Sequence, residues 1–205
     1  MLDYKKLKAL TPHFGKTNGN LFTYKEFEHL LNLRPFVNEQ RFIPALDKHR
    51  YLWPTPSWHS QLNCWPVSAI KQVLKYSAIY LRDCSRANRK INGFSEKLEA
   101  IFKRPVDCHI YFSNNSNISL SFGKHKDVSH NVIVVQSGKI NFKIFNENEY
   151  DDKVRQVKIL SKGDYAFVPA GVYHSVDSLT KKRLSCSFPI TLNGNSFDER
   201  EWLSI

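Results

Sequence analysis

The sequence is poor in cysteine and lacks the cysteine patterns that bind metals or cross-link small domains. Its four cysteines, Cys64, Cys84, Cys108 and Cys186, form no Cys-x-x-Cys pair and are irregularly spaced. Structural zinc sites and disulfide frameworks both depend on regular cysteine spacing, so this pattern argues against either. We therefore expect buried, reduced thiols in a cytoplasmic protein.

Long apolar runs are missing as well. No stretch approaches the roughly 18 apolar residues that a membrane-spanning helix needs. The opening residues, MLDYKKLKALTPHFGK, contain no apolar core of the kind found in secretory signal peptides. We expect no membrane association and no signal peptide, and the length of 205 residues suits a single domain.

Acidic residues are fewer than basic ones, and the deficit is uneven. The chain has 30 Lys and Arg against 19 Asp and Glu, a net charge of +11. Residues 1–110 hold 18 basic and 9 acidic residues, whereas residues 111–205 hold 12 and 10. A basic surface of this kind favours polyanionic partners such as RNA or an acidic peptide, although an ordinary solvated basic surface has the same composition.

Helical signals dominate the first half of the chain. Thr23 and Glu26 fit a capping box, which predicts a helix over about residues 23–32. Two further helices are expected over 67–77 and from Ser95 onward. Residues 34–66 contain five prolines and three tryptophans, which predicts an irregular segment packed on the core by its aromatic rings.

The second half alternates between apolar and polar residues. Short apolar runs are separated by Asn, Gly, Asp or Ser turns, a pattern typical of a small antiparallel barrel or jelly roll. Strands are predicted over 106–112, 117–122, 131–136, 139–145, 154–160, 164–168, 173–177 and 183–190. The expected organisation is one mainly β domain over 1–205, with a helical and irregular N-terminal part over 1–105, a barrel core over 106–190 and a C-terminal tail over 191–205.

Two histidines and an aspartate form a pattern that suits an oxygen-activating metal. His125 and Asp127 lie at a predicted strand start, and residues i and i+2 of a strand face the same side. His174 follows Asp127 after 47 residues, behind the Pro-Ala-Gly turn at 169–171. Two imidazoles and one carboxylate make the facial triad of non-haem iron, which leaves positions for oxygen and a chelating co-substrate. We expect the nearby His130 to support the site or lie at the surface rather than to be a ligand.

These motifs resemble those of the cupin-fold JmjC-type oxygenases, which are iron- and 2-oxoglutarate-dependent hydroxylases of proteins and some RNAs. The stretch GDYAFVPAGVYH is similar to the second cupin motif, and HKDVSHNVIVVQSGKINFKIF resembles the family's His-x-Asp strand with its Gln-x-Gly turn. The resemblance extends from Pro66 to Ile190 and implies a double-stranded β-helix preceded by helices. It also implies Fe(II) on His125, Asp127 and His174, with 2-oxoglutarate as co-substrate.

The resemblance is less uniform at the co-substrate residues. Asn131 stands where many cupins have a glutamate ligand, and in related hydroxylases an Asn there helps to hold 2-oxoglutarate. The distal carboxylate needs a cation because burying it unpaired is costly. The family's common cation position is Ile140 here, with Lys139 beside it on the opposite strand face. Arg183 and Ser185 resemble the carboxylate clamp of the other large branch of these oxygenases, and we favour them over Lys139.

The resemblance implies an Fe(II)- and 2-oxoglutarate-dependent dioxygenase that hydroxylates a side chain of a peptide or protein, with RNA as a second candidate substrate. Ile140 leaves open a metal-dependent cupin that acts on a small molecule without 2-oxoglutarate. A third hypothesis is a nucleic-acid-binding module in which the basic N-terminal half binds and the cupin barrel serves as a scaffold. Because oxygenases of this kind are often dimers, a homodimer is a candidate assembly.

Overall fold

The computed structural model describes residues 2–17, 20–31, 40–44, 77–114, 123–146 and 152–192. These residues form helices α1 (Tyr4–Lys8), α2 (Tyr24–Leu31) and α6 (Arg89–Phe102), and strands β1 (His13–Lys16), β2 (Gln40–Pro44), β3 (Ser77–Leu81), β4 (His109–Ser113), β5 (His130–Ser137), β6 (Lys139–Phe145), β7 (Val154–Ser161), β8 (Asp164–Val168), β9 (His174–Ser178) and β10 (Arg183–Ile190). Within this described part, none of the helices has the length and apolar character needed to span a membrane.

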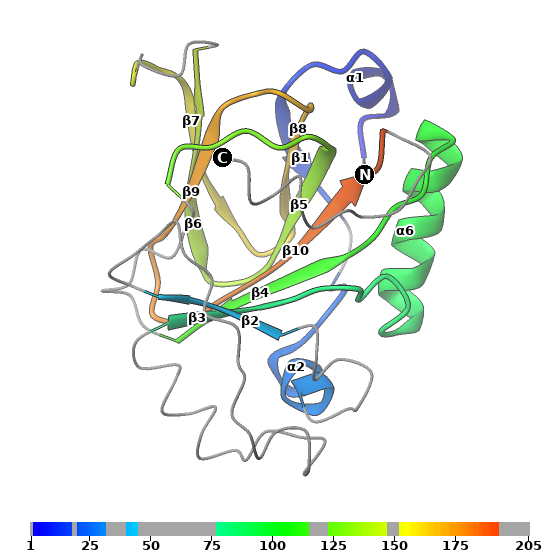
Figure 1. Cartoon of the computed structure of the whole chain (residues 1–205), viewed down its shortest axis with the longest axis vertical. Helices are drawn as coiled ribbons and strands as arrows, with labels where there is room; N and C mark the ends of the chain where they lie inside the picture. Colours follow the sequence, from blue (N-terminus) through cyan, green and yellow to red (C-terminus); the bar gives the residue numbers. More distant parts are fainter. Residues whose placement is uncertain are drawn as a thin grey trace.

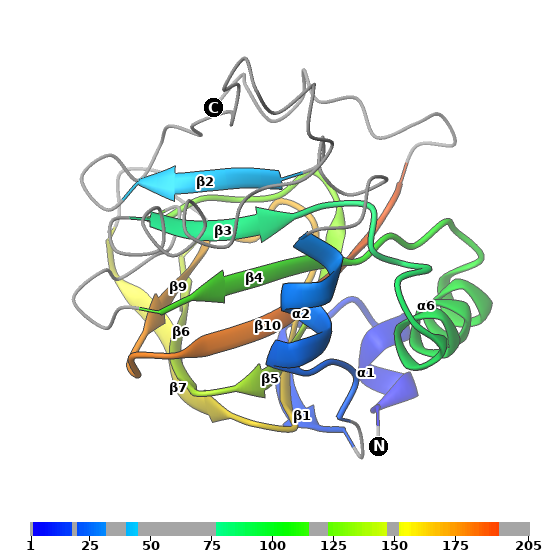
Figure 2. The same ribbon diagram turned by 90° about the horizontal axis from the view of Figure 1, so that it is seen from below.

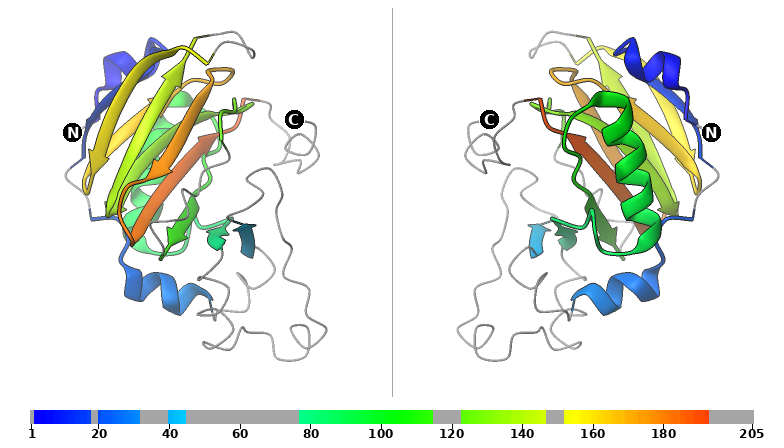
Figure 3. Two further views of the ribbon diagram at one scale, coloured as in Figure 1. Left: turned by 90° about the vertical axis from the view of Figure 1, so that its left-hand side faces the viewer. Right: turned by 90° about the vertical axis from the view of Figure 1, so that its right-hand side faces the viewer.

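The strands form two antiparallel sheets that face each other (Figures 1 and 3). The larger sheet has the order β1-β8-β5-β10-β4-β3-β2, and the smaller has the order β7-β6-β9. Ile133 and Val135 of the larger sheet pack against Ile140 and Phe142 of the smaller in one buried cluster. The mainly β jelly roll predicted from the alternating pattern is therefore the observed fold.

The helices cover the outer face of the larger sheet, as Figures 2 and 3 show. Val132 and Val134 on β5 point to this side, opposite to Ile133 and Val135, because side chains alternate along a strand. They join a second apolar cluster that includes Leu98 of α6. The interior between the two sheets is thus separate from the helix-covered core, and it is the interior that holds the candidate site.

Most of the predicted strands are confirmed. The bounds of β6, β8 and β10 match the prediction, and those of β5, β7 and β9 differ by a residue at one or both ends. The strand expected from 106 begins at His109, while Val106 makes an isolated bridge to Ile190. The strand expected over 117–122 lies outside the described residues. So do the helix expected over 67–77 and the irregular segment over 34–66, apart from Ser77 in β3 and residues 40–44 in β2.

The N-terminal part, residues 1–105, was predicted to be helical and irregular, but it also contributes three strands. Strands β1, β2 and β3 all join the larger sheet, so residues before 105 contribute to the barrel wall. Four residues of β1 are too few to show a period, and the apolar run in β3 reads equally well as a helix. Pairing with β8 and β4 decides their conformation instead.

Helix α2 begins as its capping box predicts. Glu26 Oε2 accepts from the Thr23 amide at 2.7 Å, and Thr23 Oγ1 accepts from the Glu26 amide at 3.2 Å. Helix α6 begins at Arg89 rather than at the predicted Ser95, because Asn88 supplies the cap. The start signal was therefore an asparagine seven residues before the predicted start at Ser95.

Replacing Asn88 by Ala should destabilise the fold by about 2 kcal/mol, more than an ordinary cap. Asn88 Oδ1 accepts from the Ile91 amide at 2.8 Å, and Nδ2 donates to the Leu21 carbonyl at 3.1 Å, so one side chain joins α6 to the segment before α2. Urea unfolding measures the change. Asn92→Ala is the matched control. Within the described residues the side-chain amide of Asn92 donates to Glu96 of the same helix, so its loss should reduce the free energy of unfolding by less than half as much. Equal losses would contradict this role of Asn88.

Candidate metal centre

The backbone brings His125 and His174 side by side. The two residues form an isolated antiparallel bridge, in which the His125 amide donates to the His174 carbonyl at 3.0 Å and the His174 amide donates back at 2.8 Å. His174 is the first residue of β9, whereas His125 precedes β5 and lies in no longer strand. As predicted, the distal histidine comes from another segment than the His-x-Asp pair, but that pair lies before β5 rather than at the start of a strand.

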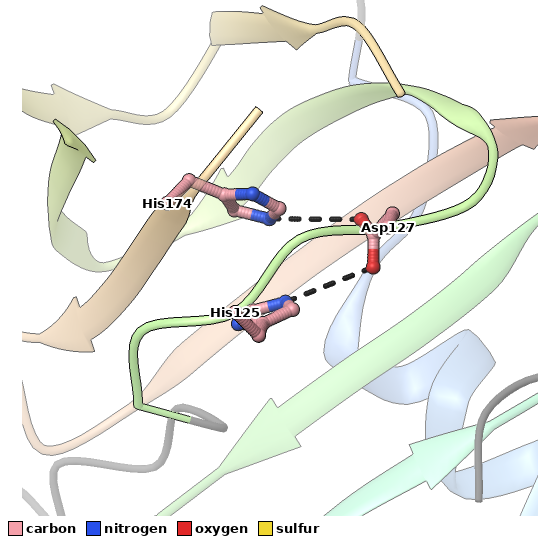
Figure 4. Close-up of side chains that lie close together, drawn as sticks. All are labelled: His125, Asp127 and His174. Atoms are coloured by element: carbon pink, nitrogen blue, oxygen red, sulfur yellow. Dashed lines mark ion pairs between the residues drawn. The ribbon is translucent and has the colours of Figure 1, made fainter. Parts of the chain in front are cut away.

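The three side chains converge between the sheets (Figure 4). Asp127 Oδ2 lies 3.6 Å from His174 Nε2, and Asp127 Oδ1 lies 3.8 Å from His125 Nε2. One donor atom from each residue falls within 4.8 Å of the others. Atoms this close surround a space that fits one small cation, and two imidazole nitrogens with one carboxylate are a donor set suited to Fe(II).

Both imidazoles are oriented with Nε2 toward Asp127. Nδ1 of His125 lies 3.1 Å from the Gly123 carbonyl oxygen, and Nδ1 of His174 lies 3.0 Å from the Val172 carbonyl oxygen. A carbonyl can only accept, so each Nδ1 carries a proton, and the neutral form of either imidazole then has its lone pair on Nε2. This carbonyl support is the arrangement that fixes metal-binding histidines in other proteins.

The electrostatic setting keeps His174 neutral at pH 7. Burial and the neighbouring His125 lower its pKa to about 4, although Asp127 and the Val172 carbonyl act in the opposite direction. A neutral imidazole is the form that binds a metal, so no proton need leave His174 on binding. The side chain of His174 is 2% exposed and that of His125 15%, so His174 is the more deeply buried of the two.

Asn131 and Ser187 hold Asp127 from inside the barrel. Asn131 Nδ2 donates to Asp127 Oδ2 at 2.6 Å, and Asn131 Oδ1 accepts from Ser187 Oγ at 3.0 Å. The predicted co-substrate residue Asn131 therefore lies beside the metal donors and supports one of them. Ser187 was not predicted from the sequence. It lies two residues after Ser185 and four after Arg183 on β10, so all three side chains face the same side of the strand.

Replacing Asn131 by Ala should weaken metal binding by roughly 10- to 100-fold, the usual effect of removing a group that orients a ligand. Without the amide, Asp127 can rotate away from the two imidazoles. Titration of the metal-free protein with Co(II), followed by absorption, measures the affinity. Asn141→Ala, on the solvent side of β6, should leave it unchanged. Equal affinities for Asn131→Ala and the wild type would contradict the orienting role.

Arg183 and Ser185 line the same interior. Arg183 is 6% exposed, its Nη2 donates to Ser185 Oγ at 3.2 Å, and its guanidinium carbon lies 5.9 Å from the Tyr111 ring centre. Burial lowers the pKa of Arg183 to about 10, with Tyr111 and Asp177 opposing, so the guanidinium stays charged at pH 7. Arg183 lies four residues from Ser187 on β10, roughly 13 Å along the strand. The cation thus lies in the barrel at a distance from the metal donors.

Lys139 does not reach this interior. It is exposed, whereas Ile140 is fully buried in the cluster between the sheets. The two residues therefore occupy opposite faces of β6, as the alternation predicts. Of the two cations that the sequence offered, the structure brings Arg183 into the barrel and leaves Lys139 outside it.

A cluster of three buried polar residues, on β3, at the start of β4 and just before β4, was not predicted from the sequence. His109 Nε2 lies 2.9 Å from Asp107 Oδ2, and His109 Nδ1 lies 2.9 Å from the Tyr80 hydroxyl. Burial opposes ionisation of Asp107, but His109 and the amides of Cys108 and Asp83 together lower its pKa. Polar residues at 107, 109 and 111 alternate along the chain, and that period was the available signal.

Comparison with known proteins places the fold. No protein-family model matches the chain, and no curated protein matches its sequence. Among solved structures it is similar to YcfD, a ribosomal oxygenase from Escherichia coli, with a TM-score of 0.66 and 15% identity over 99% of this chain and 54% of that chain. A second crystal structure of YcfD gives a TM-score of 0.67 at 14% identity over 98% of this chain and 53% of that chain. YcfD in complex with cobalt and 2-oxoglutarate gives 0.64 at 15% identity, over the same shares as the first.

The similarity covers nearly all of this chain but only part of YcfD. This chain spans about half the length of YcfD. At this identity the likeness concerns the arrangement of the backbone and not individual side chains. The described strands, the two facing sheets and the helices on the larger sheet together give this chain the double-stranded β-helix fold that YcfD has.

Proposed function

We propose that this chain is an Fe(II)- and 2-oxoglutarate-dependent oxygenase that hydroxylates a side chain of a peptide or protein. The observation that carries the proposal is the composition of the barrel interior. The donor atoms of His125, Asp127 and His174 converge within 4.8 Å, and the buried guanidinium of Arg183 lies further along the same interior. A metal that keeps open positions and a separate cation are what a chelating dicarboxylate requires.

The comparison supports the proposal. YcfD is a ribosomal oxygenase, and it has been solved with cobalt and 2-oxoglutarate and with cobalt and succinic acid. In such a reaction 2-oxoglutarate loses carbon dioxide and takes up one oxygen atom of O2, which gives succinate, while the second oxygen atom goes to the substrate. A protein side chain is accordingly the first substrate class to test, and a ribosomal protein is the first example of it.

Each residue has a role in the proposed site. His125, Asp127 and His174 would hold Fe(II), and Asn131 keeps the carboxylate of Asp127 in place. Arg183 and Ser185 would bind the distal carboxylate of 2-oxoglutarate through a charged donor and a hydroxyl. Bound iron and 2-oxoglutarate supply the oxygen-activating chemistry, while the apolar half of the barrel, which includes Ile140 and Phe142, excludes water from it.

The test is succinate formation coupled to oxygen uptake. The purified protein is incubated with Fe(II), 2-oxoglutarate and ribosomal protein extracts, and succinate and a mass increase of one oxygen atom are measured. The Asp127→Ala variant is the control for non-enzymatic oxidation. If the wild-type protein neither binds 2-oxoglutarate in calorimetry nor forms succinate with any extract, the proposal is wrong.

One observation favours a second candidate. Ile140 is fully buried and apolar at the family's common cation position, which suits a metal-dependent cupin that acts on a small molecule without 2-oxoglutarate. Such a protein would bind Co(II) but give no heat with 2-oxoglutarate. Binding to RNA, a homodimeric assembly and a cytoplasmic location stay predictions from the sequence.

A further inference from the structure

The turn that presents His174 is attached to the His-x-Asp segment. Residues 169–171 form this turn, and Gly171 adopts a left-handed φ of +79° that favours glycine. The Gly171 amide donates to the Asp127 carbonyl at 2.8 Å, and the Ala170 amide donates to Nδ1 of His130 at 2.9 Å. Together with the backbone bridge between His125 and His174, these bonds fix where β9 begins.

The attachment at His130 differs from the others because it uses a side chain. The bonds to His125 and Asp127 involve backbone carbonyls, which no substitution removes, whereas Nδ1 of His130 belongs to one residue type. His130 and Asn131 are neighbours on β5 and point to opposite faces. Asn131 holds Asp127 from inside the barrel, and His130 holds the turn from the helix-covered side.

The imidazole of His130 is itself held in place. Its ring lies 5.9 Å from that of Phe102, the last residue of α6, and 6.2 Å from that of Phe167 on β8. His130 is 9% exposed, and this burial lowers its pKa, so the ring stays neutral at pH 7 and Nδ1 remains an acceptor. The packed ring therefore presents Nδ1 as a hydrogen-bond acceptor to the amide of Ala170, four residues before His174.

We propose that His130 is a positioning residue for the metal centre, in that its imidazole holds the turn of residues 169–171 and so fixes His174 against Asp127. This rests on the proposed metal-binding function, because it assigns His130 no contact with the metal. Groups that orient metal ligands through hydrogen bonds typically change metal affinity by roughly 10- to 100-fold when removed.

The proposal is tested by Co(II) titration, and by thermal unfolding of the metal-free form, of the wild type, two variants of His130 and one control variant. His130→Phe keeps a ring against Phe102 but has no acceptor, and should bind Co(II) at least about 10-fold more weakly. His130→Asn places an oxygen near the Nδ1 position and should stay within about 3-fold of the wild type. Should the phenyl ring prevent folding, His130→Leu serves as the acceptor-free variant.

The matched control is His13→Phe. His13 is 7% exposed and also contacts the Phe167 ring, at 5.4 Å, but its nitrogens bond to Thr11 and to the Tyr165 hydroxyl. The His13→Phe variant should have a lower unfolding temperature but a Co(II) affinity within about 3-fold of the wild type, because the bonds of His13 go to Thr11 and Tyr165 and not to residues 169–171. Equal losses of affinity in His13→Phe and His130→Phe, or no rescue by His130→Asn, would overturn the proposal. Failure of the wild-type protein to bind Co(II) would instead overturn the proposed function and would be seen before any variant is compared.

Discussion

Replacing His174 by Ala is expected to abolish Co(II) binding, with a loss of affinity well above the roughly 100-fold that supporting residues can cause. His174 supplies one of three donor atoms, and its Nε2 is already neutral and directed at Asp127. Two remaining donors cannot form the facial arrangement that three provide. Succinate formation should fall to background in the same variant. Co(II) absorption and calorimetry measure the first effect, and product analysis measures the second.

The control for His174→Ala must separate lost coordination from lost packing. The His174 ring lies parallel to that of Phe142 with centres 5.7 Å apart, so its removal leaves a cavity and should lower the unfolding temperature. His174→Leu fills much of that space without a donor and should be as unable to bind Co(II). His29→Ala, on the exposed side of α2, should bind normally. Binding by His174→Leu within 10-fold of the wild type would remove His174 from the site.

The sequence predicted the parts of this fold that depend on local pattern. Strands β6 and β10 alternate between apolar and polar residues, and turn residues bound the apolar runs of β5 and β8, so the ends of all four could be predicted to within a residue. The short β1 and the apolar β3 have neither, and their conformation depends on neighbours distant in sequence. Helix α6 was placed too late because Asn88 was not recognised as its cap.

The same distinction between local pattern and long-range pairing applies to the candidate site. The convergence of His125, Asp127 and His174 was predictable, because a His-x-Asp segment and a Pro-Ala-Gly turn are local motifs with a known spatial meaning. The partners of these residues were not, because they depend on strand register. Ser187 reaches Asn131 only because β10 and β5 are neighbours, and His130 reaches Ala170 only because the turn folds back onto β5.

The identity of the co-substrate depends on Arg183. Its guanidinium is buried in the barrel, charged at pH 7 and bonded to Ser185. If it binds the distal carboxylate of 2-oxoglutarate, Arg183→Met should weaken binding at least about 30-fold, since truncating one partner of a buried charge pair costs 2 kcal/mol or more. Calorimetry of 2-oxoglutarate with the Co(II)-loaded protein measures this, and Co(II) affinity itself should be unchanged.

Lys139→Met completes the experiment, because it removes a cation that is adjacent in sequence to Ile140 but exposed on the other face of β6. We expect its 2-oxoglutarate affinity to equal that of the wild type. Loss of binding in Lys139→Met but not in Arg183→Met would mean that the carboxylate lies outside the barrel interior. If the wild-type protein binds Co(II) but no 2-oxoglutarate, the apolar and buried Ile140 favours the second candidate function, a metal-dependent cupin that acts on a small molecule without 2-oxoglutarate.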